Sequence, residues 1–268
     1  MKKLLLICAT VLFGFGQAHA QLDEDDYGFF NHVSFGVSAG TTGIGFQLAA
    51  PLTANFAVRA EYAFMPKFKY TQNIKVGSDP AFITDKVDLE GKLEMGDFSI
   101  LFDWYPSKKT TFHFTAGAYF GKEKVVAVKN KEPFVKQGNW GTAGLELGSG
   151  TDTYTLVSNK ENGDVEADLK VNSFKPYLGI GFGRAVPKKR IGVQFDLGVQ
   201  FWGKPEVWSN INAWDDAAGD WVTAYQKIDK DKITNPDKDY QDAKDAIKTI
   251  EKFGVYPVMT FRIVGRLF

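Results

Sequence analysis

The stretch FAVRAEYAF, at residues 56–64, alternates between two kinds of side chain. One set is largely apolar: Phe56, Val58, Ala60, Tyr62 and Phe64. The set between them is polar or small: Ala57, Arg59, Glu61 and Ala63. Successive side chains of a β-strand point to opposite sides. The stretch therefore predicts a strand with one apolar face and one polar face.

The same alternation recurs in seven other segments of the 268-residue chain, at residues 33–37, 44–48, 98–104, 112–120, 178–182, 191–201 and 256–268. Strand-rich chains with these two-faced segments form either soluble sandwiches or closed barrels that cross a membrane. We expect an all-β fold with eight strands. Ten or more strands is the alternative, because the connection from Gly121 to about Asn172 is long enough for another hairpin.

Connection lengths separate the sandwich from the barrel. Short links follow the second, fourth and sixth strands, at residues 51–55, 106–111 and 187–190, and long links follow the third, fifth and seventh, at residues 66–86, 121–172 and 202–254. The first link, Gly40 to Gly43, is short and departs from the trend. Short periplasmic turns with long external loops are typical of outer-membrane barrels. We therefore predict a single antiparallel transmembrane β-barrel over residues 31–268.

The N-terminus predicts export. Lys2 and Lys3 precede an apolar run that is shorter than the roughly 20 residues needed to span a bilayer, and Ala18-His19-Ala20 fits a cleavage site. We expect a signal peptide over residues 1–20, or as the alternative an uncleaved anchor, followed by a loose acidic periplasmic leader at residues 21–30. Cys8 is the only cysteine, so the exported form would have no disulfide. The near-neutral charge gives no indication of nucleic-acid binding.

Two segments carry a family resemblance. The tail Val264-Gly265-Arg266-Leu267-Phe268 is similar to the insertion signal of outer-membrane barrels. Residues 174–183, FKPYLGIGFG, are similar to the start of the penultimate hairpin in small porin-like barrels with eight strands. The resemblance implies location in the cell outer membrane. It also implies two partners: the membrane lipid, and the barrel-insertion machinery, which would read the C-terminal strand and Phe268.

The last strand departs from the family pattern, because Arg262 and Arg266 share the parity of Phe268. Either the strand contains a bulge, or its lipid face consists of Met259, Phe261, Ile263 and Leu267. A charge that faces lipid at mid-depth costs roughly 2–4 kcal/mol, which favours the second interpretation.

The polar faces predict a lumen network of Arg59, Glu61, Asp103, His113, Gln194, Asp196 and Arg262, with Asp97 and Gln200 on the same side. An eight-stranded barrel is just wide enough for its side chains to fill it, and enclosed charges must pair. We expect a plug of ion pairs, with a narrow or gated polar path as the alternative. Gly179, Gly181 and Gly183 would leave room for a large facing side chain such as Arg59 or Tyr119.

The long links contain further patterns. Residues 87–95, 122–130 and 153–159 could extend strands beyond the bilayer, with a bulge near Gly96, and residues 239–252 predict a short helix. The last link also carries the external ligand candidates Trp208, Trp214, Trp221 and Tyr225. Aromatic side chains beside polar ones can bind a glycan or a protein. Packing within the loop and membership of the outer aromatic girdle are the alternatives.

Candidate catalytic groups are few. His113 could act as a base, but Ser99 and Thr115 are nucleophile candidates by parity alone. The processed chain would keep His32 and His113 only, and its acidic clusters do not match a calcium loop, so we expect no metal, cofactor or enzymatic activity. The favoured function is a structural or external ligand-binding barrel. A narrow channel for small polar or amphipathic solutes is the alternative.

Overall fold

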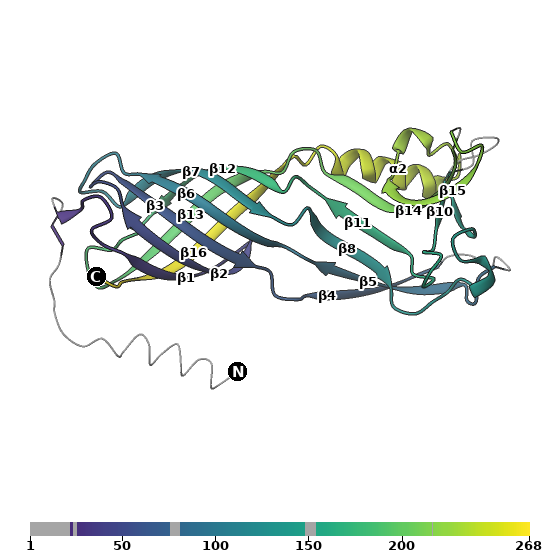
Figure 1. Cartoon of the computed structure of the whole chain (residues 1–268), viewed down its shortest axis with the longest axis horizontal. Coiled ribbons are helices and arrows are strands. Elements are labelled where there is room, and N and C mark those ends of the chain that lie inside the picture. The colour runs from purple at the N-terminus through teal and green to yellow at the C-terminus, as the bar shows by residue number, and fades with distance from the viewer. Residues whose placement is uncertain (1–21, 24–25, 76–80, 148–153, 216) are drawn as a thin grey trace.

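The computed structural model describes residues 22–23, 26–75, 81–147, 154–215 and 217–268, so the expected signal peptide lies outside the described residues. Two sheets make up the fold (Figure 1). One is a closed barrel of β1 (Ser34–Gly40), β2 (Gly43–Pro51), β3 (Phe56–Phe64), β6 (Gly96–Trp104), β7 (Phe112–Gly121), β12 (Phe174–Phe182), β13 (Ile191–Phe201) and β16 (Val255–Arg266).

The barrel confirms the eight predicted strands. Their order around the wall is β1-β16-β13-β12-β7-β6-β3-β2, and every neighbouring pair is antiparallel. The first and last strands close the wall, with Ser34 opposite Arg266 and Gly40 opposite Thr260. The alternative of ten or more barrel strands is wrong, because the link from Gly121 to about Asn172 forms strands outside the barrel.

The outer wall of the barrel is apolar and the inner wall is polar. On β16, Met259, Phe261 and Ile263 are each 49% exposed, whereas Arg262 is 1% exposed. These values confirm that Met259, Phe261 and Ile263 form the outer face of the last strand, and the pairing of this strand shows no bulge. A closed barrel leaves no unpaired strand edge, so an apolar outer wall of this kind is suited to lipid. In the described part of the chain, no helix combines the length and apolar character needed to cross a bilayer.

The long links form a second sheet rather than loops, and it extends the barrel along its axis (Figure 1). Its strands are β4 (Lys69–Lys75), β5 (Lys86–Leu93), β8 (Lys124–Asn130), β9 (Gly144–Glu146), β10 (Tyr154–Val157), β11 (Glu166–Lys170), β14 (Glu206–Asp215) and β15 (Asp220–Lys227). Two 3₁₀ helices, η2 (Gln137–Asn139) and η3 (Lys230–Lys232), and one α-helix, α2 (Lys238–Ile250), accompany it.

Alternating side chains also build this second sheet. Ile211 of β14 is fully buried with Tyr154 and Ile233, and Ile247 of α2 packs against the same cluster. The predicted short helix is confirmed, and it packs against this sheet. The expected bulge near Gly96 is wrong: Glu94 and Met95 separate β5 from β6, and Met95 packs with Trp202 where the two sheets meet.

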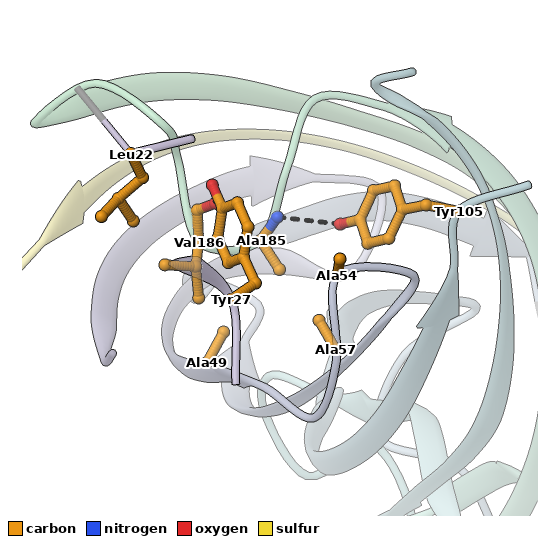
Figure 2. Close-up of a cluster of buried hydrophobic side chains, with 8 residues drawn as sticks. All are labelled: Leu22, Tyr27, Ala49, Ala54, Ala57, Tyr105, Ala185 and Val186. Atoms are coloured by element: carbon orange, nitrogen blue, oxygen red, sulfur yellow. Dashed lines mark hydrogen bonds between the residues drawn. The ribbon is translucent and has the colours of Figure 1, made fainter. Parts of the chain in front are cut away.

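The short-turn end of the barrel is closed by the leader. Leu22 and Tyr27 are buried against Ala185 and Val186, in a cluster that also contains Tyr105 (Figure 2). The Tyr27 hydroxyl donates to the carbonyl of Val186 at 3.0 Å. In its described residues the leader is therefore not the loose end that its acidic composition predicts. It forms an apolar floor beneath the lumen.

Candidate functional site

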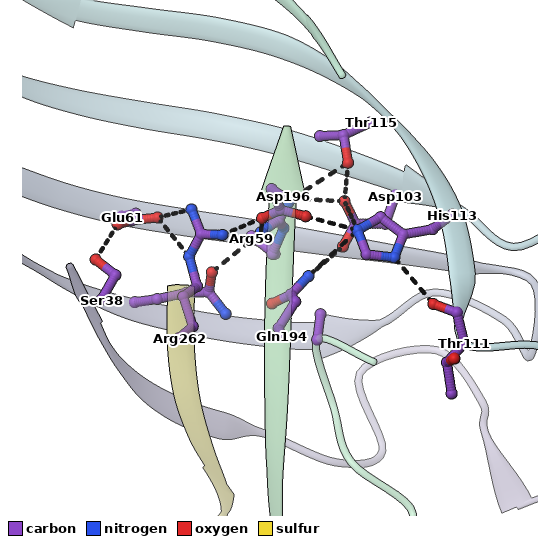
Figure 3. A network of polar contacts seen from close by, with 12 residues as sticks. Ser38, Arg59, Glu61, Asp103, Thr111, His113, Thr115, Gln194, Asp196 and Arg262 are labelled. Carbon is purple, nitrogen blue, oxygen red and sulfur yellow. Dashed lines mark hydrogen bonds and ion pairs between the residues drawn. The ribbon is translucent and has the colours of Figure 1, made fainter. Parts of the chain in front are cut away.

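The lumen contains an ion network centred on Arg59 of β3 (Figure 3). One guanidinium nitrogen lies 2.8 Å from Asp103 of β6, and the other lies 2.8 Å from Asp196 of β13. All three side chains are buried. Alternation places each of them on the inner wall, and burial among other charges leaves pairing as the way to satisfy them. Arg59 therefore links its own strand, β3, to the neighbouring β6 and to β13 on the opposite side of the barrel.

Arg262 of β16 makes a second bridge. Its guanidinium lies 2.7 Å from the Glu61 carboxylate and also contacts Asp196. The hydroxyl of Ser38 donates to the other oxygen of Glu61 at 2.5 Å. Asp196 thus accepts from both arginines, which joins the two bridges into one network (Figure 3).

His113 occupies the end of the network nearest the short turns. Its Nε2 lies 2.8 Å from Asp196, and its Nδ1 lies 3.2 Å from the backbone carbonyl of Thr111. Gln194 lies beside it, with the amide nitrogen 3.4 Å from Nε2. The structure thus places all seven lumen residues chosen from the sequence within one network.

Further layers fill the lumen on the side of the second sheet. The rings of Tyr119 and Tyr177 are 5.4 Å apart and pack with Leu101 and Val258. Beyond them, the ammonium of Lys175 lies 2.6 Å from Asp97, and both side chains are buried. The cluster of Met95, Val125, Val171 and Trp202 comes next, at the junction of the two sheets. The lumen is therefore occupied by side chains in successive layers from the floor to the mouth.

Sequence reasoning missed Lys175. Phe174, Leu178 and Phe182 of β12 are exposed on the outer wall, so Lys175 at odd parity belongs to the lumen. The alternation could have found this residue. Its partner Asp97 was already on the expected inner side, and the ion pair follows once β12 and β6 are known to flank β7.

The lumen glycines make room for residues other than those expected. A Cβ added at Gly179 would lie 2.5 Å from the Tyr177 hydroxyl. One added at Gly181 would lie 2.2 Å from Asp196 and 2.5 Å from His113. Gly183 has a φ of +102°, a conformation that glycine adopts readily. The glycines therefore leave room for Tyr177, His113 and Asp196. The expectation that they leave room for Arg59 or Tyr119 is wrong.

The candidate catalytic groups do not form a nucleophile–base pair. The Thr115 hydroxyl donates to Asp103 at 2.8 Å, and the Ser99 hydroxyl is buried without a hydrogen-bond partner. Within the residues that the structure describes, no three His, Cys, Asp or Glu side chains form a group able to hold a metal ion.

Of the external aromatic residues, Trp208 of β14 and Tyr225 of β15 face each other with ring centroids 5.7 Å apart. The ammonium of Lys170 lies over both rings, 4.0 Å and 4.6 Å from their centroids. The Tyr225 hydroxyl donates to Asp168. Burial, together with this hydrogen bond, raises the pKa of the Tyr225 phenol above its usual range. These ring faces are therefore occupied by the protein's own lysine.

Trp214 and Trp221 lie elsewhere on the same hairpin and are more open. They sit opposite each other on β14 and β15, next to the turn that joins the two strands. Their ring centroids are 5.9 Å apart in an edge-to-face arrangement, and they are 48% and 43% exposed. The four aromatic residues chosen from the sequence thus form two separate pairs.

The C-terminal residue lies just outside β16. Phe268 is 68% exposed, and its backbone carbonyl accepts from the amide of Val33 at 3.3 Å. Leu267 also donates to the carbonyl of Val33 at 2.8 Å. The tail is therefore fastened to the start of β1. The role of Phe268 as an insertion signal stays a prediction.

Comparison with known proteins finds distant structural matches. No family model matches the chain, and no curated protein matches its sequence. The crystal structures of CarO2 and CarO from Acinetobacter baumannii align at 16% and 15% identity with TM-scores of 0.47 and 0.46. They cover 88% and 89% of this chain and 98% and 99% of their own. A major outer membrane protein from Thermus thermophilus aligns at 15% identity with a TM-score of 0.29, covering 88% of this chain and 98% of its own. At this distance, the alignments say nothing about a ligand or an activity.

Proposed function

We propose that this chain is a non-enzymatic, non-conducting barrel of a Gram-negative-type outer membrane, which holds a second sheet outside the cell. The apolar outer wall supports placement in lipid, and the short turns at one end support a periplasmic orientation for that end. The second sheet then lies on the external side. The barrel acts as a rigid support for this sheet.

The filled lumen is the observation that carries the proposal. A conducting path needs a continuous polar space, yet the network around Arg59 lies between an apolar floor and a layer of tyrosine rings. Opening a path would mean separating buried ion pairs, which is costly when it leaves a charge without a partner. The narrow channel is therefore the weaker candidate.

The external hairpin of β14 and β15 supplies the binding surface in this proposal. Trp214 and Trp221 present two large, rigid rings to solvent, flanked by Asp215 and Asp220. Tryptophan is enriched among the residues that dominate binding energies at interfaces. An external glycan or protein is the ligand class that this pair suits. Trp208 and Tyr225 stabilise the base of the hairpin, because Lys170 covers their rings.

A binding screen tests the external role. The purified full chain in detergent would be presented to arrays of glycans and of extracellular proteins, together with a variant carrying Trp214→Ala and Trp221→Ala. We expect at least one ligand that the variant no longer binds. A control with Phe68→Ala and Tyr70→Ala removes two exposed aromatic side chains elsewhere and should keep binding. Equal binding by all three proteins would exclude the hairpin as the binding surface.

A further inference from the structure

The leader contains a tight turn with two phenylalanines at its centre, at residues 28–31. The amide of Gly28 donates to the side-chain oxygen of Asn31 at 3.0 Å, and the side-chain amide of Asn31 donates to the carbonyl of Asp26. The central positions of a turn usually hold small or polar residues. Here they hold Phe29 and Phe30, whose ring centroids are 4.8 Å apart. Polar bonds thus hold the turn in shape, and the two rings take no part in them.

Phe30 adopts a backbone conformation that is unusual for a bulky residue. Its φ is +52°, in the left-handed region, and among the described residues it is the one non-glycine residue with a positive φ. Such conformations persist where the surrounding structure enforces them, and they cluster at functional sites. Phe29 and Phe30 are nevertheless 77% and 51% exposed. Packing within the protein therefore explains neither the choice of two aromatic residues nor the strained backbone.

The turn lies at the short-turn end of the barrel, against the outer side of the wall. The amide of Phe30 donates to the carbonyl of Pro51, the last residue of β2, at 2.9 Å. The residue before it, Ala50, shares the parity of the exposed outer residues Phe46 and Leu48, yet it is only 5% exposed. Because the leader is the segment bonded at this point, it covers Ala50 and rests on the outer side of the wall.

The leader therefore faces two environments. Tyr27 is buried in the apolar floor beneath the lumen (Figure 2), whereas the two rings that follow it are exposed. The outer wall beside the turn is also apolar and exposed. Phe35 of β1 is paired with Leu48 of β2, and Leu267 and Phe268 follow the end of β16. The rings of the turn thus continue the apolar surface of the barrel at its short-turn end.

We propose that Phe29 and Phe30 insert among the acyl chains of the periplasmic leaflet and anchor the leader to the membrane beside the barrel. The inference rests on the membrane placement proposed above. Transfer of two aromatic rings from water into hydrocarbon is favourable, and it offsets the strained backbone of Phe30. An anchored turn keeps the preceding residues Leu22 and Tyr27 in the floor. The lipid therefore contributes to the closure of the lumen.

Spin labels measure the depth of the turn directly. Cys8 is the only cysteine and lies in the expected signal peptide, so the processed chain accepts a single new cysteine for labelling. Phe29→Cys and Phe30→Cys variants would carry a nitroxide in phosphatidylcholine vesicles. Collisions of the label with oxygen, which concentrates in lipid, would be compared with collisions with a water-soluble nickel complex.

We expect the ratio of oxygen collisions to nickel collisions to be several-fold higher at both positions than at two matched sites in water. These are Asp26→Cys in the leader and Ile83→Cys, an apolar residue that is 61% exposed in the link before β5 of the second sheet. Phe46→Cys on the outer wall is the reference for a site in lipid. The ratios at residues 29 and 30 should approach the ratio at this position.

A second measurement tests the link between the anchor and the floor. Phe29→Ser with Phe30→Asn removes both rings, and asparagine readily adopts the left-handed backbone, so the turn keeps its shape. Hydrogen exchange at the amide of Leu22, which donates to the carbonyl of Lys188 at 3.0 Å, should become several-fold faster in vesicles. Phe68→Ser with Tyr70→Ser removes two exposed aromatic residues of the external side and should leave this exchange unchanged.

Three results would overturn the proposal. Ratios at residues 29 and 30 equal to the ratio at residue 26 would place the rings in water. Few collisions with either reagent would assign the rings to a protein contact, such as one with a second copy. Unchanged exchange at Leu22 in the double variant would exclude a contribution of the anchor to the floor. A water-like ratio at Phe46→Cys would instead contradict the membrane placement itself, so the two failures are distinguishable.

Discussion

Arg262 of the last barrel strand and Glu61 of β3 are separated by 201 residues in sequence, yet their side chains meet at 2.7 Å inside the lumen. Two strands, β1 and β2, lie between β16 and β3 in the barrel wall. The pair therefore reaches across the interior rather than along the wall. With Asp196 as the shared acceptor, it joins the contacts of Arg59 and makes the middle of the barrel a closed network.

Replacing Arg262 tests the energetic weight of this network. Arg262→Met leaves Glu61 and Asp196 without one of their cations, and the loss of one partner from a buried pair costs about 3–5 kcal/mol. We expect the free energy of unfolding, measured by urea titration in lipid vesicles, to fall by about that amount. Combining Arg262→Met with Glu61→Gln should recover part of the loss. Unchanged stability in the single variant would show that the network contributes little.

Gly181→Ala tests the packing beside His113. The added Cβ would lie 2.2 Å from a carboxylate oxygen of Asp196 and 2.5 Å from the His113 ring, so both side chains must move. We expect a loss of about 1–3 kcal/mol in the free energy of unfolding, as for other overpacked cores. Gly265→Ala is the matched control, because its nearest heavy atom would be 3.9 Å away. Equal effects of the two substitutions would contradict the tight packing described here.

The titration of Tyr225 should make the stability of the external sheet depend on pH. Burial and the hydrogen bond to Asp168 raise the pKa of its phenol, so the folded state holds this proton more firmly than the unfolded state. The contribution to stability is complete below the usual tyrosine pKa of about 10 and is lost as the pH rises through the folded value. The thermal midpoint should therefore decrease as the pH rises above about 10, the usual tyrosine pKa, toward the raised pKa of the folded state.

The matched comparison for this prediction uses two variants. Tyr225→Phe removes the titrating group and should reduce the alkaline fall, whereas Tyr70→Phe replaces an exposed tyrosine and should leave the fall as it is. A fall of equal size in both variants would assign the pH dependence to other groups.

Alternation predicts the barrel well because one physical constraint acts on every strand: outer side chains are apolar and exposed, whereas inner ones are enclosed. Phe56, Val58 and Tyr62 obey this rule, and the parity of Arg59 and Glu61 follows from it. The partners inside the lumen could not be predicted. They depend on the stagger between strands, which brings Arg262 to Glu61 across two intervening strands.

The second sheet is harder to predict, because the side chains on its outward side do not all face the same kind of environment. Val207 and Ile211 of β14 alternate with Trp208 and Trp214, and this period of two was present in the sequence. It was obscured because the outward side carries both aromatic and amide side chains, which are also typical of loops. The leader presents the opposite case: its acidic residues suggest a loose end, whereas Leu22 and Tyr27 bury it.

Single-channel recording in a planar lipid bilayer tests the closed lumen most directly. We expect the purified full chain to insert without steady openings, because the layers from the floor of Tyr27 to the mouth at Trp202 fill the interior. A variant with Arg59→Ala and Arg262→Ala serves as the comparison, since it removes the two cations that bridge the lumen. Steady openings of uniform size from the unmodified protein would contradict a closed lumen.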